Sequence, residues 1–296
     1  MPVDAAYAAC ARLARAHYEN FPVASYLLPR RMRPHVAAVY AYARLADDIA
    51  DEGAAPAALR HARLDEWLER LEAAADGRTP PQATQLDPET AAAAPAVFTA
   101  LGSSMRECGL PTQLFRDLVS AFRQDTTVAR YESWPELLDY CRRSANPVGR
   151  LVLRIAGHDD EAAAKASDAV CTALQLTNFW QDIAVDWSRG RLYLPAQEYR
   201  RTGAVTDSLD RREITPAWRD ALSAAALRTR ELFATGRGVC DAVSGRLRWQ
   251  LRLTWLGGSR ILDRLERGGF DVFGSRPTLT LADAPALLWK AAGWRT

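Results

Sequence analysis

The chain has 296 residues, a length compatible with one large helical unit, and 48% of them are apolar while 25% are charged. Its net charge of +2 is too small to indicate a nucleic-acid-binding protein. The sequence contains no apolar run long enough to span a bilayer and no secretion signal at its N-terminus, so a cytoplasmic protein is expected.

Apolar residues recur at three- and four-residue spacing along most of the chain, which predicts helices. Only residues 278–281 alternate in the manner of a strand, and no repeat is visible. We therefore expect an all-α fold with a single domain over residues 1–296. Helices are expected at residues 4–19, 34–53, 57–75, 89–107, 112–124, 134–144, 146–155, 160–187, 216–235, 239–267 and 285–292, with a loop at 76–88 and a polar connector at 195–215.

The predicted helix 160–187 carries a ladder of polar side chains. Gln175, Asn178, Asp182 and Asp186 lie three or four residues apart and therefore share one stripe of the helix. Carboxylates four residues apart repel each other by about 0.2–0.5 kcal/mol on an isolated helix. The ladder therefore favours a cation as its partner.

A second acidic ladder lies in the predicted helix 34–53. Tyr40, Arg44, Asp47 and Asp51 share one stripe, with Asp48 beside it. One such ladder alone is typical of a solvated helix face, but two copies among apolar neighbours indicate a metal site. Two facing ladders could hold several Mg2+ ions with positions left for water and substrate phosphates, as a diphosphate leaving group requires.

Several common cofactor and metal motifs are absent from the sequence. It contains no Walker A loop, no Gly-x-Gly-x-x-Gly after a strand and no His-Glu-x-x-His, which disfavours nucleotide-dependent redox chemistry. Its five cysteines show no Cys-x-x-Cys spacing. They are expected to be reduced and mostly buried, without a zinc site or a disulfide framework.

Three motifs together resemble the squalene/phytoene synthase family, the head-to-head isoprenyl diphosphate synthases. Tyr-x-x-x-Arg-x-x-Asp-Asp-x-x-Asp begins at Tyr40, Asn-x-x-x-Asp-x-x-x-Asp begins at Asn178, and Gly-Arg-x-Tyr-x-Pro begins at Gly190. This combination is highly specific. The resemblance runs through residues 21–29, 40–52, 130–149, 175–195 and 260–263.

The resemblance implies an isoprenoid synthase fold, with helices around a central cavity and Mg2+ as the cofactor. By position, Asp47 and Asp51 match the first metal motif of the family, and Asn178, Asp182 and Asp186 match the second. These four aspartates are also candidate catalytic residues.

The resemblance also implies positions for substrate contacts. Tyr40 and Arg44 are further catalytic candidates, expected with Arg191 near the diphosphate, where guanidinium groups bind phosphate oxygens bidentately. A salt bridge to Asp48 is the structural alternative for Arg44. Candidates for an apolar wall that shields a carbocation are Phe21, Tyr140, Phe179 and Trp255, although core packing is the alternative for each. Besides Arg191, the candidate substrate contacts are Phe21, Tyr140, Val148, Gly149, Gln175, Phe179, Gln181 and Tyr193.

Two departures from the family pattern bear on the reaction. The chain has Asn20-Phe21-Pro22 where squalene and phytoene synthases commonly have Ser-Phe-Tyr, and Gly258 where they have tyrosine. These segments look instead like the bacterial hydroxysqualene synthases of hopanoid biosynthesis. Such enzymes ionise presqualene diphosphate and let water capture the rearranged cation, without a hydride donor.

Two alternatives to that reaction remain. The chain could condense two prenyl diphosphates as a presqualene diphosphate, squalene or phytoene synthase, or it could be a non-catalytic assembly protein on the same fold. A hydroxysqualene synthase would act with an upstream presqualene diphosphate synthase and a downstream hydroxysqualene reductase. Its substrate would be an isoprenoid diphosphate with long apolar chains. The enzyme would contact the inner face of a membrane peripherally.

Overall fold

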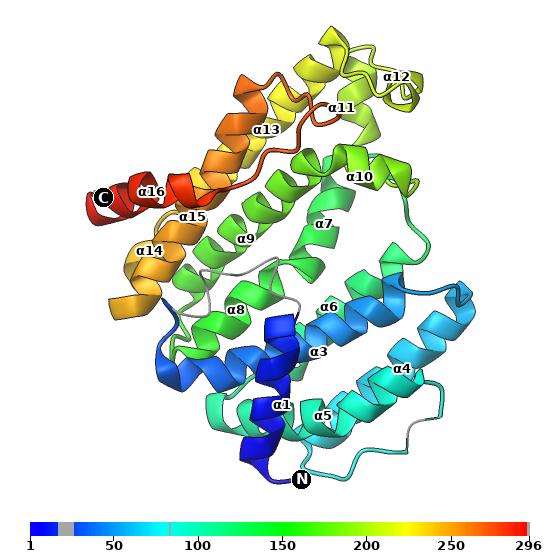
Figure 1. Cartoon of the computed structure of the whole chain (residues 1–296), viewed down its shortest axis with the longest axis vertical. Helices are drawn as coiled ribbons and strands as arrows, with labels where there is room; N and C mark the ends of the chain where they lie inside the picture. The colour runs from blue at the N-terminus through cyan, green and yellow to red at the C-terminus, as the bar shows by residue number, and fades with distance from the viewer. Residues whose placement is uncertain (17–26, 83, 295–296) are drawn as a thin grey trace. The chain divides into compact units, whose positions relative to one another are not determined.

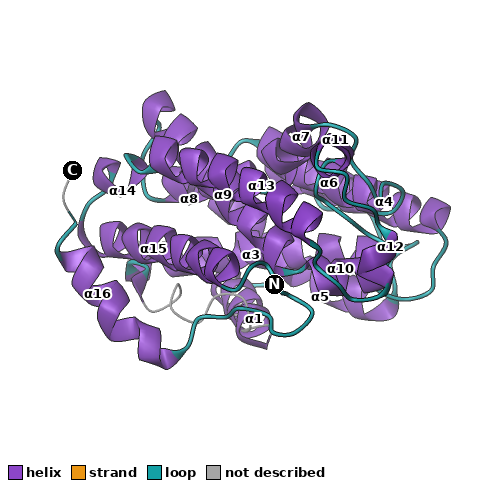
Figure 2. Cartoon of the chain, turned by 90° about the horizontal axis from the view of Figure 1, so that it is seen from above, coloured by secondary structure: helices purple, strands orange, loops and turns teal. Residues whose placement is uncertain are grey.

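The computed structural model describes residues 1–16, 27–82 and 84–294. Every regular element in these ranges is a helix, which confirms the predicted all-α class (Figures 1 and 2). The chain forms two compact units, one of residues 1–127 with 147–160 and one of residues 128–146 with 161–296. No helix within the described ranges is long and apolar enough to cross a bilayer.

The first unit packs its helices around a cluster of four aromatic rings. Tyr42, Trp67, Phe98 and Phe115 are buried, and their ring centroids lie 4.6–6.0 Å apart. They come from four different helices, so the cluster holds these helices together by apolar burial and ring contacts. The elements of this unit are α1 (Val3–Ala16), η2 (Arg30–Met32), α3 (Arg33–Asp51), α4 (Ala57–Ala75), α5 (Pro88–Cys108), α6 (Thr112–Asp125) and α8 (Asn146–Ile155).

In the second unit, α9 (Glu161–Gln181) is the helix on which the others pack. α13 (Pro216–Gly236) lies so close to α9 that a Cβ atom on Gly236 would come within 2.5 Å of the carbonyl oxygen of Ala166. Only glycine permits this approach of the two backbones. The other elements are α7 (Trp134–Ser144), α10 (Ile183–Ser188), α11 (Ala196–Arg201), α12 (Asp207–Asp210), α14 (Val239–Ala242), α15 (Gly245–Arg267), η3 (Leu281–Asp283) and α16 (Ala284–Ala292).

Most predicted helices are confirmed, and those at 57–75 and 134–144 have the expected ends. The helix predicted at 4–19 is described as far as Ala16, and the rest of it lies outside the described residues. Residues 278–280 are irregular rather than a strand. The five cysteines are free, and three of them are buried, as expected.

Three predicted segments differ from the structure. The helix predicted at 160–187 is divided at Asp182, and the one at 239–267 is divided where Val243 and Ser244 take extended backbone. Val243 is buried there, so packing outweighs helical periodicity. The predicted connector contains α11 and α12, which are too short to show a periodic pattern.

Glu66 on α4 ties down the loop before α5. Its buried carboxylate accepts hydrogen bonds from the backbone N–H groups of Gln85, at 2.8 Å, and Thr84, at 3.1 Å, and it pairs with Arg70. Burial alone would raise the pKa of Glu66, but these hydrogen bonds and the Arg70 charge outweigh it and lower the pKa.

We expect Glu66→Gln to lower the free energy of unfolding at pH 7 by about 1–3 kcal/mol, because buried donors lose a charged acceptor. A lowered folded-state pKa stabilises the fold above the unfolded pKa of about 4.3, and this contribution is lost as the pH falls through the folded value. Urea denaturation should therefore show a difference at pH 7 that shrinks under acid conditions. Glu69→Gln, at an exposed position of the same helix, is the control. Equal effects of the two substitutions would contradict the anchoring role of Glu66.

Candidate functional site

The first acidic ladder lies on the face of α3 that is turned away from the aromatic core. The core face of α3 is fully buried through residues such as Tyr42, Leu45 and Ile49. The stripe from Tyr40 to Asp51 runs along the other side, where side chains are half-buried or exposed. The helical pattern therefore places the ladder at a surface of the first unit, as the spacing predicts.

Acidic side chains crowd the C-terminal end of α3. Four of the six residues from Asp47 to Glu52 are acidic, at the end of the helix where the macrodipole is negative. Arg44 neutralises part of this negative charge, because its guanidinium lies 2.6 Å from Asp48 and 3.1 Å from Glu52. Arg60 from α4 donates to backbone carbonyls at the same end, including that of Gly53.

The pKa values on this ladder respond to burial and to neighbouring charges. Burial raises the pKa of Tyr40, and Asp48 and Asp47 raise it further. Burial is also the main cause of the raised pKa of Asp48, with Arg44 acting in the opposite direction. Arg44 thus forms an ion pair with Asp48, which was the structural alternative named for it in the sequence analysis.

The second ladder keeps its register although the helix that carries it is divided. Asp182 lies between α9 and α10, with φ −104° and ψ 10°. The backbone N–H of Asp182 still donates to the carbonyl of Asn178 at 2.9 Å, and that of Asp186 donates to Asp182 at 2.8 Å. The four-residue steps that align Asn178, Asp182 and Asp186 are therefore preserved across the division.

Arg276 contacts this ladder and was not predicted from the sequence. Both carboxylate oxygens of Asp182 accept hydrogen bonds from the Arg276 guanidinium, one from NH2 at 3.1 Å and the other from Nε. This hydrogen bonding raises the pKa of Arg276, and Asp186 contributes to the same shift. The side chain of Gln181 donates to the carbonyl of Pro277, so residues 276–277 lie against the ladder. Arg276 is 94 residues from Asp182, and no spacing rule on a single helix could find it.

A buried aromatic cluster lies on the inner side of the same ladder. Phe179, one residue after Asn178, stacks on Tyr193 with ring centroids 3.8 Å apart and planes 5° apart. Tyr140 lies 6.0–6.1 Å from both rings, and Tyr131 lies 5.6–5.8 Å from Tyr140 and Tyr193. The structure thus groups three predicted residues. It adds Tyr131, which the sequence had placed only within a matched segment.

The remaining predicted residues divide between the two units. Val148 and Gly149 belong to the first turn of α8 in the first unit. Gln175 and Arg191 are half-buried in the second unit, where the backbone N–H of Arg191 donates to the carbonyl of Asp186 at 2.8 Å. Phe21 lies outside the described residues.

Trp255 is half-buried and packs against two other aromatic rings. Its ring lies 5.7 Å from Phe233 and 5.3 Å from Trp294, and its indole N–H donates to the carbonyl of Phe233. A cavity of about 290 Å3 lies beside it, between α13, α15 and α16. Among the predicted site residues that the structure describes, Trp255 is the one that lines this cavity.

Each ladder offers a donor set that suits Mg2+. Asp47 and Asp51 provide two carboxylates on α3, and Asp182 and Asp186 provide two more beside the amide of Asn178. Among the described residues, no three or more His, Cys, Asp or Glu side chains lie together where they could hold a metal ion by themselves. Mg2+ commonly binds through one or two carboxylates and completes its shell with water and substrate phosphates. The residues therefore fit this ion.

A sequence model of squalene/phytoene synthases matches residues 14–283 of the chain. The chain belongs to the squalene/phytoene synthase family. A hydroxysqualene synthase of Rhodopseudomonas palustris is 37% identical over 227 residues, which cover 74% of this chain and 69% of that protein. A phytoene synthase of Thermus thermophilus is 31% identical over 282 residues, covering 95% and 90%. The chain is accordingly an isoprenoid synthase.

Solved structures agree with this assignment. The crystal structure of a squalene synthase from Alicyclobacillus acidocaldarius superposes with a TM-score of 0.81 at 40% identity, covering 91% of this chain and 97% of that one. A dehydrosqualene synthase superposes with a TM-score of 0.84 at 21% identity, covering 99% and 97%. The predicted squalene-synthase-like isoprenoid synthase fold is thereby confirmed.

Gly258 lies on α15, at the position where the sequence resemblance leads us to expect a tyrosine in other synthases of the family. A Cβ atom there would meet Leu174 of α9 at 2.5 Å and Phe233 of α13 at 2.8 Å. The two neighbouring side chains thus occupy the space into which a side chain at 258 would extend. The packing around position 258 therefore suits glycine and leaves no room for a tyrosine side chain.

We expect Gly258→Tyr to lower the free energy of unfolding by about 1–3 kcal/mol, because the ring must displace Leu174 and Phe233 from a packed contact. Thermal or urea denaturation measures the change. Adding Leu174→Ala should recover part of the loss, whereas Leu174→Ala alone should destabilise the protein. A Gly258→Tyr variant as stable as the parent would contradict this packing.

Proposed function

We propose that this isoprenoid synthase is a hydroxysqualene synthase that acts on presqualene diphosphate. The observation that carries the proposal is its likeness to three proteins named hydroxysqualene synthase, which are 34–37% identical over 74–84% of the chain. The sequence resemblance at Gly258 supports it, because a tyrosine is expected there in the family's condensing enzymes.

The two acidic ladders are proposed to bind magnesium and the diphosphate. On the first unit, Asp47 and Asp51 would hold Mg2+. On the second unit, Asn178, Asp182 and Asp186 would hold it. When bound, the metal supplies Lewis-acid stabilisation of the charge that develops on the departing diphosphate. The carbon–oxygen bond then breaks with its electron pair on the leaving group.

Basic and polar side chains are proposed to position the diphosphate. Arg44 and Arg191 would bind its oxygens, and Arg44 would exchange its contact with Asp48 for the substrate. Arg276 donates to both carboxylate oxygens of Asp182, so this guanidinium would share Asp182 with Mg2+ or be displaced by it. Further substrate contacts are proposed for Tyr40, Phe21, Val148, Gly149, Gln175 and Gln181.

The carbocation formed after ionisation needs protection from indiscriminate reaction with water. The cluster of Tyr131, Tyr140, Phe179 and Tyr193 offers buried aromatic surface directly beside the second ladder. Aromatic faces attract cations, and an apolar wall limits the water that reaches them. We propose that this cluster shields the cation until one water adds its oxygen and loses a proton.

The reaction proposed for this chain defines its partners. Its substrate would come from a presqualene diphosphate synthase, and its product would pass to a hydroxysqualene reductase in hopanoid biosynthesis. Because both compounds carry long isoprenoid chains, we also propose peripheral contact with a membrane.

Condensation of two prenyl diphosphates is the second candidate. It is favoured by the likeness to the Thermus thermophilus phytoene synthase over 95% of the chain and by the squalene synthase structure at 40% identity. Such an enzyme would use the same ladders for a different substrate.

Incubation with presqualene diphosphate and Mg2+ should yield hydroxysqualene and diphosphate, measured by mass spectrometry and a phosphate assay. Farnesyl diphosphate alone should give no coupled product. Removing the metal with EDTA should stop turnover. Asp182→Asn should abolish turnover without unfolding the protein, whereas Asp220→Asn, an exposed carboxylate on α13, should leave it unchanged.

Coupling of farnesyl or geranylgeranyl diphosphate would replace the proposal with a condensing enzyme. A folded protein that turns over no isoprenoid diphosphate would favour a non-catalytic assembly role. Full activity of Asp182→Asn would contradict the metal role of the second ladder.

A further inference from the structure

The outer face of the C-terminal helix is an exposed apolar stripe. Leu281 is 94% exposed, Trp289 82% and Leu288 49%, and Pro285 and Ala292 are exposed beside them. Counted from Leu281, the other four residues follow at steps of four (Pro285), seven (Leu288), eight (Trp289) and eleven (Ala292). This is helical spacing, so all five share one side of the η3–α16 segment. We call these five residues the α16 stripe.

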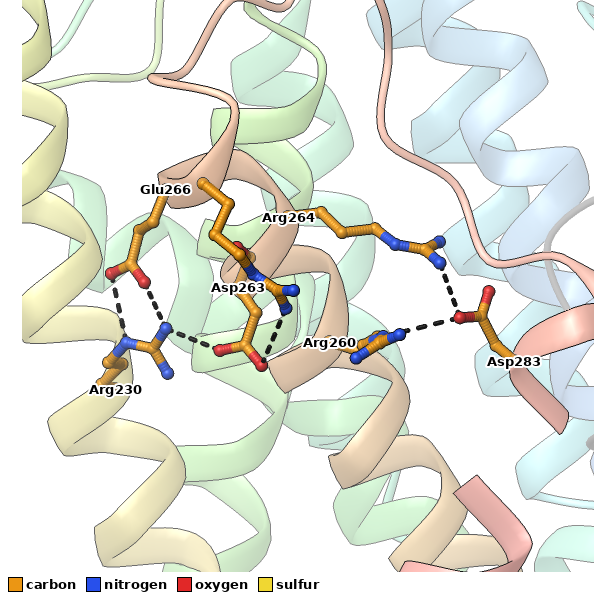
Figure 3. Close-up of polar contacts among 7 residues, drawn as sticks. Arg230, Arg260, Asp263, Arg264, Glu266 and Asp283 are labelled. Atoms are coloured by element: carbon orange, nitrogen blue, oxygen red, sulfur yellow. Dashed lines mark hydrogen bonds and ion pairs between the residues drawn. The ribbon is translucent and has the colours of Figure 1, made fainter. Parts of the chain in front are cut away.

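The opposite side of the same segment is anchored to α15. Asp283 is buried and lies 2.6 Å from Arg264 and 3.5 Å from Arg260, as Figure 3 shows. Ala291 is fully buried, and its carbonyl accepts a hydrogen bond from Arg252 at 3.2 Å. These contacts fix which face of α16 packs on the second unit. The outward direction of the α16 stripe therefore follows from specific contacts.

Such a stripe differs from scattered surface apolar residues. Single exposed leucines are common on soluble proteins and need no explanation. Here the large apolar side chains follow the helical repeat, and the face carries no charged residue. A continuous apolar face on a firmly anchored helix indicates a binding surface.

The charge of α16 favours an anionic partner. The helix carries one charged side chain, Lys290, and no acidic one. Lys290 follows Trp289 directly and is exposed. Tryptophan beside basic side chains is typical of surfaces that lie at the headgroup level of a bilayer.

We propose that the α16 stripe docks the enzyme on a bilayer that contains anionic lipids. The choice of a lipid partner rests in part on the proposed function, because presqualene diphosphate carries long apolar chains that partition into membranes. Leu281, Leu288 and Trp289 enter the interface, and Lys290 attracts the headgroups.

Vesicle co-sedimentation of the full chain, without substrate or metal, tests the proposal independently of the catalytic activity. The protein should bind vesicles of phosphatidylcholine and phosphatidylglycerol, bind pure phosphatidylcholine more weakly, and lose affinity in high salt. The double substitution Leu281→Ser and Trp289→Ser should weaken binding at least tenfold, because each side chain loses apolar burial. Leu227→Ser, which changes a leucine that is 60% exposed on α13, should leave binding unchanged.

Both variants should melt at the temperature of the parent, since the altered side chains are exposed. Failure of the parent to bind either vesicle type would overturn the proposal. So would equal binding by the double variant, or equal binding to both vesicle types. A dimer that the double variant dissociates, measured by light scattering, would assign the stripe to a second copy instead.

Discussion

The crowding of negative charge near helix ends is the constraint on which the rest of the site depends. α3 gathers Asp47, Asp48, Asp51 and Glu52 where the macrodipole is already negative. α9 and α10 stack Asp182 and Asp186 four residues apart. Carboxylates placed in this way repel one another, and nearby cations relieve that repulsion. Both ladders meet a guanidinium in the structure, from Arg44 and from Arg276. A divalent ion that binds a diphosphate would serve the same electrostatic need.

The packing of each unit holds its ladder on a rigid element. The aromatic cluster that contains Tyr42 holds the core face of α3 in place. Close contact with α13 at Gly236 holds α9 in place. The side chains of the ladders therefore project from helices whose positions are set by apolar burial. The proposed chemistry needs this rigidity, because ions must be held at fixed positions while the leaving group departs.

Sequence periodicity predicted most of the helices and the register of both ladders, because these depend on interactions between residues three and four apart. It could not predict the division at Asp182 or the contact with Arg276, which bring together residues far apart in the chain. Sequence periodicity likewise could not predict that Phe179 stacks on Tyr193, although both residues were candidate substrate contacts. The packing around Gly258 also depends on α9 and α13, and the sequence showed only that the tyrosine was missing.

The central claim is that the two ladders bind Mg2+ together with a diphosphate, and calorimetric titration with Mg2+ tests it most directly. In the presence of an unreactive phosphonate analogue of presqualene diphosphate, the chain should take up Mg2+ more tightly than without it. The combined substitution Asp47→Asn and Asp182→Asn should remove this uptake while the protein stays folded. Absence of any Mg2+ binding by the parent chain, with the analogue present, would contradict the account.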